Sequence, residues 1–252
     1  MKPLALQLYS VRDAAKNDLA GTLKKVAEMG YLGVELAGMH GHTTEQVRDL
    51  LQDVGLKATS VHQGDVSSEN VNELAESADM LRFDNIVIPH RPAECFHDPM
   101  AIQQLANDLE VAAGLLEAKG MTLSYHNHDH EMVLIDGRHA FEILLEMAPR
   151  LRPQVDTYWA ADHGKYDPAE FVTKVGAKAR SIHIKDGPLE KGAAMQAVGA
   201  GKMDIPAVVE AANQFESIEW LIVELDKCDG DMMQAVAESA TYMIGEGLAK
   251  GR

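Results

Sequence analysis

The sequence predicts a single (β/α)8 TIM barrel of the α/β class. Short apolar segments typical of strands alternate eight times with amphipathic segments typical of helices within 252 residues, and polar residues recur where the strands are expected to end. Eight βα units in about 250 residues are the signature of this barrel, whose active sites lie at the carboxyl ends of the strands. A doubly wound open sheet is the weaker alternative.

The expected strands are short, apolar and rich in β-branched or aromatic residues, as in a buried parallel sheet. In chain order they are Leu4–Ser10, Gly33–Ala37, Lys57–Gln63, Asn85–His90, Thr122–His128, Pro153–Trp159, Arg180–Asp186 and Trp220–Asp226. The first strand leads into Tyr9-Ser10-Val11-Arg12-Asp13, which contains no glycine-rich fingerprint. A Rossmann-type dinucleotide site is therefore not expected.

The expected helices are amphipathic and carry terminal signals. They are Leu19–Met29, Thr44–Val54, Glu69–Leu81, Ile102–Lys119, His139–Met147, Pro168–Val175, Ile205–Phe215 and Met232–Leu248. Thr43-Thr44-Glu45-Gln46 resembles a capped start, and Asp167-Pro168 places a cap before a proline at the first helical position. Gly30, Gly55 and Gly120 follow helix ends, where a left-handed residue often stops a helix.

The composition indicates one domain spanning residues 1–252. Hydrophobic residues make up 46% of the chain, and no proline-, glycine- or serine-rich linker divides it. No apolar run approaches the length of a membrane span, and the apolar start, Met1–Leu6, is too short for a signal peptide. Cys95 and Cys228 show no metal-site or disulfide spacing. We expect a cytoplasmic protein with no membrane partner; a homo-oligomer is compatible with the sequence.

The charge balance argues against a nucleic-acid partner. Acidic residues outnumber basic ones by 39 to 23, which gives a net charge of −16, and the basic residues are scattered along the chain. A phosphate backbone would be repelled over most of such a surface. A local cationic pocket or a bound divalent metal can still attract a small polar ligand.

The segment from Tyr125 to Glu131 is the densest group of polar side chains in the sequence. It holds three imidazoles and two carboxylates in seven residues, directly after a strand-like run. The period of a strand places His126 and His128 on one face, and Glu131 lies just beyond the strand, where a loop begins. This pattern favours the rim of a metal or polar-ligand site, although a solvated polar turn is the alternative.

Polar residues recur at nearly every other expected strand. They are Gln7, Tyr9, Glu35, His62, His90, Asp156, His183, Lys185, Glu224 and Asp226. Each has an ordinary interpretation taken alone: His62 as a hydrogen-bonded core histidine, Glu35 as the buried partner of a lysine, Lys185 as a surface cation. Together they indicate a ligand site, because one barrel mouth cannot hold so many unsatisfied polar groups.

Three carboxylates and one imidazole form a candidate metal site: Glu131, Asp156, His183 and Glu224. Oxygen donors with one imidazole suit Mn²⁺, Mg²⁺, Co²⁺ or Fe²⁺ better than a thiolate-rich zinc site does. His126 is the rival of Glu131, because it lies on the strand itself, whereas Glu131 reaches the site only if the loop folds back. We favour Glu131 because a carboxylate is the harder ligand.

The strand-end motifs, taken in order, resemble those of a known family. They are Gln7-Leu8-Tyr9-Ser10-Val11-Arg12, Gly33-Val34-Glu35-Leu36, Tyr125-His126-Asn127-His128-Asp129-His130-Glu131, Val155-Asp156-Thr157-Tyr158-Trp159, Ile182-His183-Ile184-Lys185-Asp186-Gly187 and Val223-Glu224-Leu225-Asp226. The chain resembles the sugar phosphate isomerase/epimerase family, the xylose-isomerase-like TIM barrels that include inosose dehydratases and ketose 3-epimerases. The resemblance covers essentially the whole chain and does not identify the substrate.

The resemblance implies one divalent metal, with Mn²⁺ favoured and Mg²⁺, Co²⁺, Fe²⁺ or Zn²⁺ as alternatives. Its ligands would be a Glu, Asp, His and Glu from strands five to eight, which correspond to Glu131, Asp156, His183 and Glu224. In ketose epimerases of the family the first ligand is a glutamate on strand five itself, where this chain has His126. The chain therefore departs from the family pattern at the first ligand.

The resemblance also implies a reaction class. Removal of a proton beside a carbonyl gives an enediolate, which a divalent cation stabilises. We expect a metal-dependent isomerase or epimerase of a small sugar, keto sugar or cyclitol. An inosose-dehydratase-like lyase is the alternative, and an endonuclease IV-type nuclease or a non-catalytic sugar-binding barrel is less favoured.

The candidate residues divide into two groups by expected role. Glu131 and Glu224 are expected to combine ligand and acid–base roles, and His128 and Lys185 to polarise the substrate or deliver protons. The remaining candidates are expected to contact the substrate: Gln7, Glu35, His62, His90, His126 and Trp159.

Overall fold

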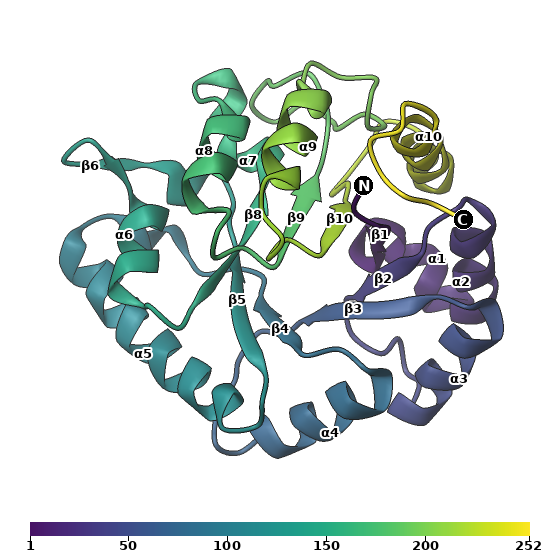
Figure 1. Cartoon of the computed structure of the whole chain (residues 1–252), viewed down its shortest axis with the longest axis horizontal. Helices are drawn as coiled ribbons and strands as arrows, with labels where there is room; N and C mark the ends of the chain where they lie inside the picture. The colour runs from purple at the N-terminus through teal and green to yellow at the C-terminus, as the bar shows by residue number, and fades with distance from the viewer.

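Eight parallel strands close into a barrel (Figure 1). The computed structural model describes residues 1–252, and the strands follow one another around the barrel in the order β1-β10-β9-β8-β5-β4-β3-β2. Their bounds are β1 Leu4–Gln7, β2 Gly33–Leu36, β3 Lys57–His62, β4 Asn85–Ile88, β5 Thr122–His126, β8 Arg152–Asp156, β9 Ser181–Ile184 and β10 Trp220–Val223. The predicted TIM barrel is confirmed.

The strands end earlier than predicted at their carboxyl ends. Residues Leu8–Val11 form the 3-10 turn η1 directly after β1, and Thr157–Ala160 form the short helix α7 directly after β8. Asp156 begins α7, because its Oδ1 accepts the N–H of Trp159 at 2.9 Å. The apolar pattern continues in the sequence beyond these points. The strands end earlier because a polar side chain at the strand end caps the helical turn that follows.

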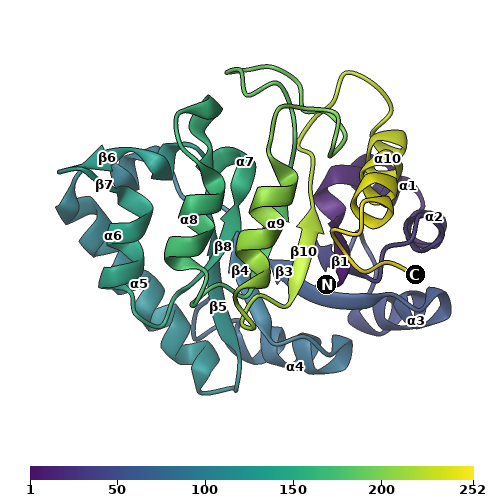
Figure 2. The ribbon, with the colours of Figure 1, turned by 45° about the horizontal axis from the view of Figure 1, so that its top comes forward.

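Ten helices accompany the strands, and the longer ones surround the barrel (Figures 1 and 2). They are α1 Arg12–Asn17, α2 Leu19–Glu28, α3 Thr44–Val54, α4 Val71–Leu81, α5 Pro99–Glu117, α6 Ala140–Met147, α7 Thr157–Ala160, α8 Pro168–Val175, α9 Ile205–Asn213 and α10 Met232–Gly245. Three further 3-10 turns lie in the loops: η2 Ala93–Phe96, η3 His130–Met132 and η4 Asp162–Gly164.

The helix starts follow the signals in the sequence. Thr43 and Gln46 form a complete capping box at α3. Carboxylate oxygens of Asp98, Asp167 and Asp231 accept backbone N–H groups in the first turns of α5, α8 and α10 at 2.8–2.9 Å. Such caps satisfy donors that have no partner within the helix, so each helix begins at a defined residue.

A two-stranded hairpin after β5 is absent from the predicted elements. β6, Leu134–Ile135, pairs antiparallel with β7, Arg138–His139, and projects beside α6 (Figure 1). The turn between them is Asp136-Gly137, and both residues have positive φ angles, 50° and 81°. An Asp-Gly pair is the sequence signature of such a turn, so the signal was present.

The two ends of the barrel differ in chemistry. Pro3 bridges to Lys250, so both termini lie near the amino ends of the strands (Figure 2). The loops after β9 and β10 extend past the opposite end of the barrel (Figure 2). At that end the strands finish in or lead into polar residues such as His62, His126 and Asp156. None of the helices has the length and apolar character needed to cross a membrane.

Candidate metal and substrate site

Four buried side chains from four neighbouring strands converge at the carboxyl end of the barrel. They are His126 at the end of β5, Asp156 at the end of β8, His183 in β9 and Glu224 directly after β10. One potential ligand atom from each lies within 4.8 Å of the others. These strands are adjacent in the barrel, which brings residues far apart in the sequence into one group.

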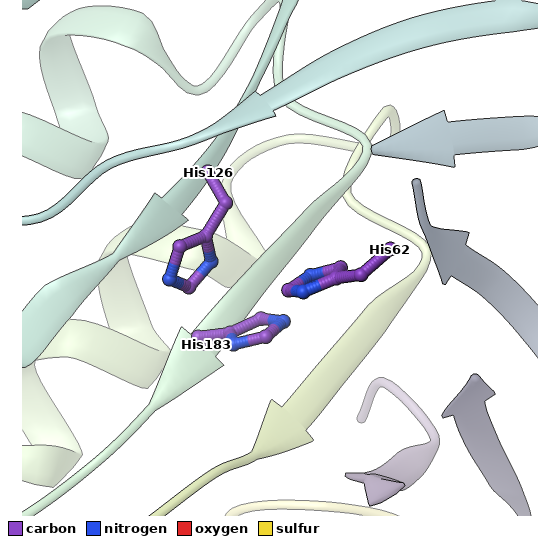
Figure 3. A group of neighbouring side chains, drawn as sticks. All are labelled: His62, His126 and His183. Carbon is purple, nitrogen blue, oxygen red and sulfur yellow. The ribbon is translucent and has the colours of Figure 1, made fainter. Parts of the chain in front are cut away.

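The atoms of this group face a common point. Nε2 of His126 lies 3.5 Å from Oδ2 of Asp156 and 3.9 Å from Oε2 of Glu224. Nδ1 of His183 lies 2.7 Å from the same Glu224 oxygen. Figure 3 shows the imidazole of His62 directed toward those of His126 and His183, and the His126 and His183 ring centres are 4.6 Å apart.

Glu131 lies outside this group, contrary to its expected place as a ligand. The Tyr125 hydroxyl donates to its Oε1 at 2.7 Å, and the backbone N–H of His128 donates to its Oε2 at 2.8 Å. Tyr125 precedes His126 in β5, so its side chain points away from the barrel interior. The turn η3 carries Glu131 to the Tyr125 side of the strand, and His126 stands where the first ligand was expected.

Lys185 is fully buried instead of lying on the surface. Its Nζ is 2.9 Å from Oδ2 of Asp156, 2.9 Å from Oε2 of Glu224 and 2.8 Å from Oδ2 of Asp226. Burial alone would lower the pKa of Lys185, but these three carboxylates raise it well above its usual value. The ammonium therefore stays charged and compensates part of the negative charge of the site.

Glu35 lies beneath the site, fully buried, and contacts His183. Its Oε2 is 2.7 Å from Nε2 of His183 and accepts a hydrogen bond from the Gln7 amide at 2.7 Å. Its Oε1 accepts from Ser60 at 2.6 Å and from the Gln154 amide at 2.7 Å. Gln7 and Glu35 are expected substrate contacts, yet the structure uses them to hold other side chains.

A register shift between β2 and β3 makes this arrangement possible. The pairing changes from Val34 opposite Ala58 to Glu35 opposite Ser60. Such irregularities redirect side chains and are common beside functional sites. Here the shift sets the Ser60 hydroxyl against the Glu35 carboxylate.

The two central imidazoles differ in protonation: His183 is cationic and His126 is neutral. Burial lowers the pKa of His183, but the carboxylates of Glu35 and Glu224 raise it to about 10, so both ring nitrogens carry protons at neutral pH. Burial holds the pKa of His126 well below its usual value, and the cation at His183 lowers it further. His126 is consequently neutral, the form in which an imidazole binds a metal.

A cavity of about 230 Å³ opens above the group. Its lining consists of Tyr9, His62, Pro89, His90, His126, His128, Glu224 and Asp226. Burial lowers the pKa of His128 to about 3, and its Nδ1 has no hydrogen-bond partner. A buried polar atom of this kind is available to a bound ligand.

Trp159 stands beside the cavity and does not line it. Its ring centre is 6.1 Å from that of His128 and 5.6 Å from the Lys185 ammonium. The indole thus packs against the side chains that form the site, and its contact with a sugar ring stays a prediction.

One central residue, Gln154, is missing from the sequence-based candidates. Its amide oxygen is 2.9 Å from Nε2 of His62 and 3.1 Å from Nδ1 of His126, while its nitrogen donates to Glu35. It precedes Asp156 by two residues in β8, and so it faces the same side of the strand. That period is the signal that could have identified it.

The donor set of the four-residue group fits a divalent transition metal. It offers two carboxylates and two imidazole nitrogens, and His183 would give up its Nδ1 proton when a metal binds. This combination suits Mn²⁺, Fe²⁺, Co²⁺ or Zn²⁺. Oδ2 of Asp156 is buried and accepts no directed hydrogen bond, so it has a free lone pair. The Lys185 ammonium forms an ion pair with this oxygen at 2.9 Å.

Comparison with known proteins agrees with the fold. Residues 23–244 match the family model described as the xylose isomerase-like TIM barrel. No curated protein matches the sequence.

Solved structures extend the likeness to the whole chain. A sugar phosphate isomerase/epimerase from Parabacteroides distasonis has a TM-score of 0.80 and 22% identity over 99% of this chain and 96% of its own. The 3-keto-D-glucoside 4-epimerase of E. coli has a TM-score of 0.70 and 16% identity, covering 97% and 100%. The IOLI protein with a zinc atom has a TM-score of 0.74 and 14% identity, covering 98% and 99%. At these identities the likeness shows the fold.

Proposed function

The chain belongs to the xylose isomerase-like TIM barrel family, and we propose that it is a divalent-metal-dependent isomerase or epimerase of a sugar, keto sugar or cyclitol. The observation that carries the proposal is the buried group His126, Asp156, His183 and Glu224 beneath the cavity at the carboxyl ends of the strands. Two of the similar structures carry isomerase or epimerase names, and a third contains zinc.

We assign the metal ligands to these four residues, with His126 in place of Glu131. Mn²⁺ is favoured, with Mg²⁺, Co²⁺, Fe²⁺ or Zn²⁺ as alternatives. When bound, the cation would polarise a substrate carbonyl and stabilise the charge that develops when the neighbouring proton leaves. Glu35 would hold His183 through its other ring nitrogen, as outer carboxylates commonly do for histidine ligands.

Glu224 is the candidate proton acceptor. It lines the cavity, and although burial raises its pKa, Lys185 and His183 hold that pKa well below the usual value. The carboxylate is therefore ionised at neutral pH and able to accept a proton from a substrate carbon. His128 faces the same cavity as a neutral imidazole, which suits a hydrogen bond to a substrate oxygen.

The other cavity residues suit the hydroxyl groups of one small molecule. His62, His90, Tyr9 and Asp226 offer both donors and acceptors around the opening. Every lining residue except Pro89 carries a polar group on its side chain. A polyol with one carbonyl satisfies these groups better than an apolar ligand would.

Proton exchange with solvent tests the proposal. The metal-supplemented protein would be incubated in heavy water with a panel of ketoses, keto-glycosides and inososes, and NMR would follow deuterium entering the carbon beside the carbonyl. Glu224→Gln should depress exchange strongly. Because it also removes a partner of the buried Lys185 and His183, exchange is compared in variant protein that circular dichroism shows to be folded. Glu219→Gln is the matched control, because Glu219 is exposed next to the amino end of β10. Turnover without any deuterium entry, or full exchange by Glu224→Gln, would contradict the mechanism.

A dehydratase is the second candidate, supported by one further observation. The Lys185 ammonium lies 2.8 Å from Asp226, which lines the cavity together with Glu224, so a proton donor stands at the cavity edge near the proposed proton acceptor. Elimination needs both, because the departing hydroxyl must leave as water. The same incubations separate the two activities, since a dehydratase forms an unsaturated product that absorbs in the ultraviolet and an epimerase does not.

A further inference from the structure

The metal site already contains a cation that belongs to the chain. Nζ of Lys185 lies 2.9 Å from Oδ2 of Asp156 and 2.9 Å from Oε2 of Glu224. These are the two oxygens that face His126 and His183 in the four-residue group. The lysine therefore contacts the oxygens that we assign as metal ligands.

A divalent metal and the ammonium cannot both keep these contacts. A metal binds carboxylate oxygens at about 2.0–2.2 Å, so it would lie within a few ångströms of a cation held by the same two oxygens. The repulsion between a double and a single positive charge at that separation is large in a buried site. Lys185 is fully buried, so water does not screen it.

The third contact of Lys185 offers the ammonium another position. Oδ2 of Asp226 lies 2.8 Å from Nζ, and the Asp226 side chain is 30% exposed and lines the cavity. Asp226 is outside the four-residue group. The ammonium can retain this carboxylate while it releases Asp156 and Glu224.

We propose that Lys185 is an internal counter-cation, which neutralises the ligand carboxylates in the metal-free protein and moves toward Asp226 when a divalent metal binds. The proposal rests on the proposed function, since it concerns the same metal. Lys185 thereby lowers the affinity for the metal and keeps the empty site stable. Metal binding also carries a positive charge to the edge of the cavity, where substrate oxygens are expected.

This exchange accounts for the pattern of contacts. In a metal-free barrel that lacked the lysine, Asp156 would lose its one ammonium partner, and Glu224 would keep only the His183 imidazolium that it shares with Glu35. Poorly compensated buried charge of this kind is strongly destabilising. With Lys185 present, the protein can fold before it acquires metal. The cost is a weaker site, because the metal must replace an existing interaction.

The first test measures Zn²⁺ affinity by calorimetry and by competition with a chelator. Lys185→Met should bind Zn²⁺ at least about ten-fold more tightly than the unsubstituted protein, since two charge–charge contacts no longer compete with the metal. Lys202→Met is the matched control: Lys202 is an exposed lysine paired with Glu190, and its loss should leave the affinity unchanged. Equal or weaker binding by a folded Lys185→Met variant overturns the proposal.

The second test needs no variant. In a crystal structure of the unsubstituted protein with Zn²⁺, Nζ of Lys185 should contact Asp226 and no longer contact Asp156 or Glu224. An ammonium that remains against both ligand oxygens beside a bound zinc overturns the exchange while leaving the metal site intact. Failure of both proteins to bind Zn²⁺ or Mn²⁺ would instead overturn the metal-dependent function itself, and the lysine proposal with it.

Discussion

Replacing Glu35 by glutamine is expected to weaken both the fold and the metal site. The carboxylate accepts hydrogen bonds from Gln7, Ser60 and Gln154 and contacts His183 at 2.7 Å. Each of its oxygens faces at least two of these groups. An amide keeps the shape but turns one oxygen into a donor, which would oppose the donors already there. It also removes the charge that compensates His183.

The size of the effect follows from the buried ion pair. Breaking such a pair by removing one partner typically costs about 3–5 kcal/mol, because the remaining charge is left uncompensated. That is a large part of the about 5–15 kcal/mol by which a domain is stable. The orientation of His183 also depends on Glu35, and loss of such an outer carboxylate weakens metal affinity by about 10–100-fold.

Urea denaturation of the metal-free proteins at pH 7 and Zn²⁺ titration would measure the two effects. Glu142→Gln is the matched control, because Glu142 is also a buried glutamate but is held by the exposed amine of Lys174 far from the site. We expect a change of about 0–1 kcal/mol there. If Glu35→Gln unfolds at the same urea concentration as the unsubstituted protein and binds Zn²⁺ equally well, Glu35 does not position His183.

Three further predictions concern the pH dependence of stability and the identity of the metal ligands. Because the pKa of His183 is raised to about 10, its contribution to the stability of the metal-free protein should be complete below about pH 6.5 and disappear as the pH rises toward about 10, and Glu35→Gln should flatten that decline. A free energy of unfolding in EDTA that is constant over this range would refute the charge assignment. Asp156→Asn should weaken Zn²⁺ binding at least about 100-fold, beyond the loss expected for an outer residue. Glu131→Gln should leave Zn²⁺ affinity unchanged and reduce stability by about 1–3 kcal/mol, because Tyr125 loses a charged acceptor; the reverse ranking of the two variants in calorimetry would restore Glu131 as the ligand.

The barrel was predictable because its signal is repeated eight times, so that an error in one element does not change the architecture. Strand ends were less predictable, since Asp156 stops β8 by capping α7 and not by any loss of apolar pattern. The hairpin Leu134–His139 has a clear turn signal, Asp136-Gly137, but two strands of two residues leave too short a pattern to detect.

The sequence predicts the position of His126 in the site but not the position of Glu131. Strand alternation places His126 on the inner face of β5, and this follows from the sequence once the strand is known. The position of Glu131 depends on the turn η3, whose direction is set by contacts with Tyr125 and the backbone of His128. Ligand hardness favours Glu131, but a residue must first reach the site, so backbone geometry decides.

The height of each polar residue along the barrel axis was also not predictable from the sequence. Gln7 and Glu35 are opposite one another in the register of β1 and β2, and both are fully buried although Gln7 is the last residue of β1. His62 and Glu224 lie at the ends of their strands and line the cavity. A strand pattern indicates which face a side chain occupies, whereas its height follows from the stagger of neighbouring strands.

These heights separate the negative charge of the site into two layers with different compensation. Glu35, in the lower layer, is enclosed by His183 and by neutral, buried hydrogen-bond donors. Asp156 and Glu224, in the upper layer, are compensated by Lys185, which also reaches the partly exposed Asp226. His183 joins the layers, since one ring nitrogen contacts Glu35 and the other contacts Glu224. A rigid lower layer fixes the direction of His183, and only the upper layer can exchange its cation. Substitutions in the lower layer should therefore change stability and metal affinity together. In the upper layer, the Lys185→Met variant should be less stable than the unsubstituted protein without metal, and added metal should restore its stability.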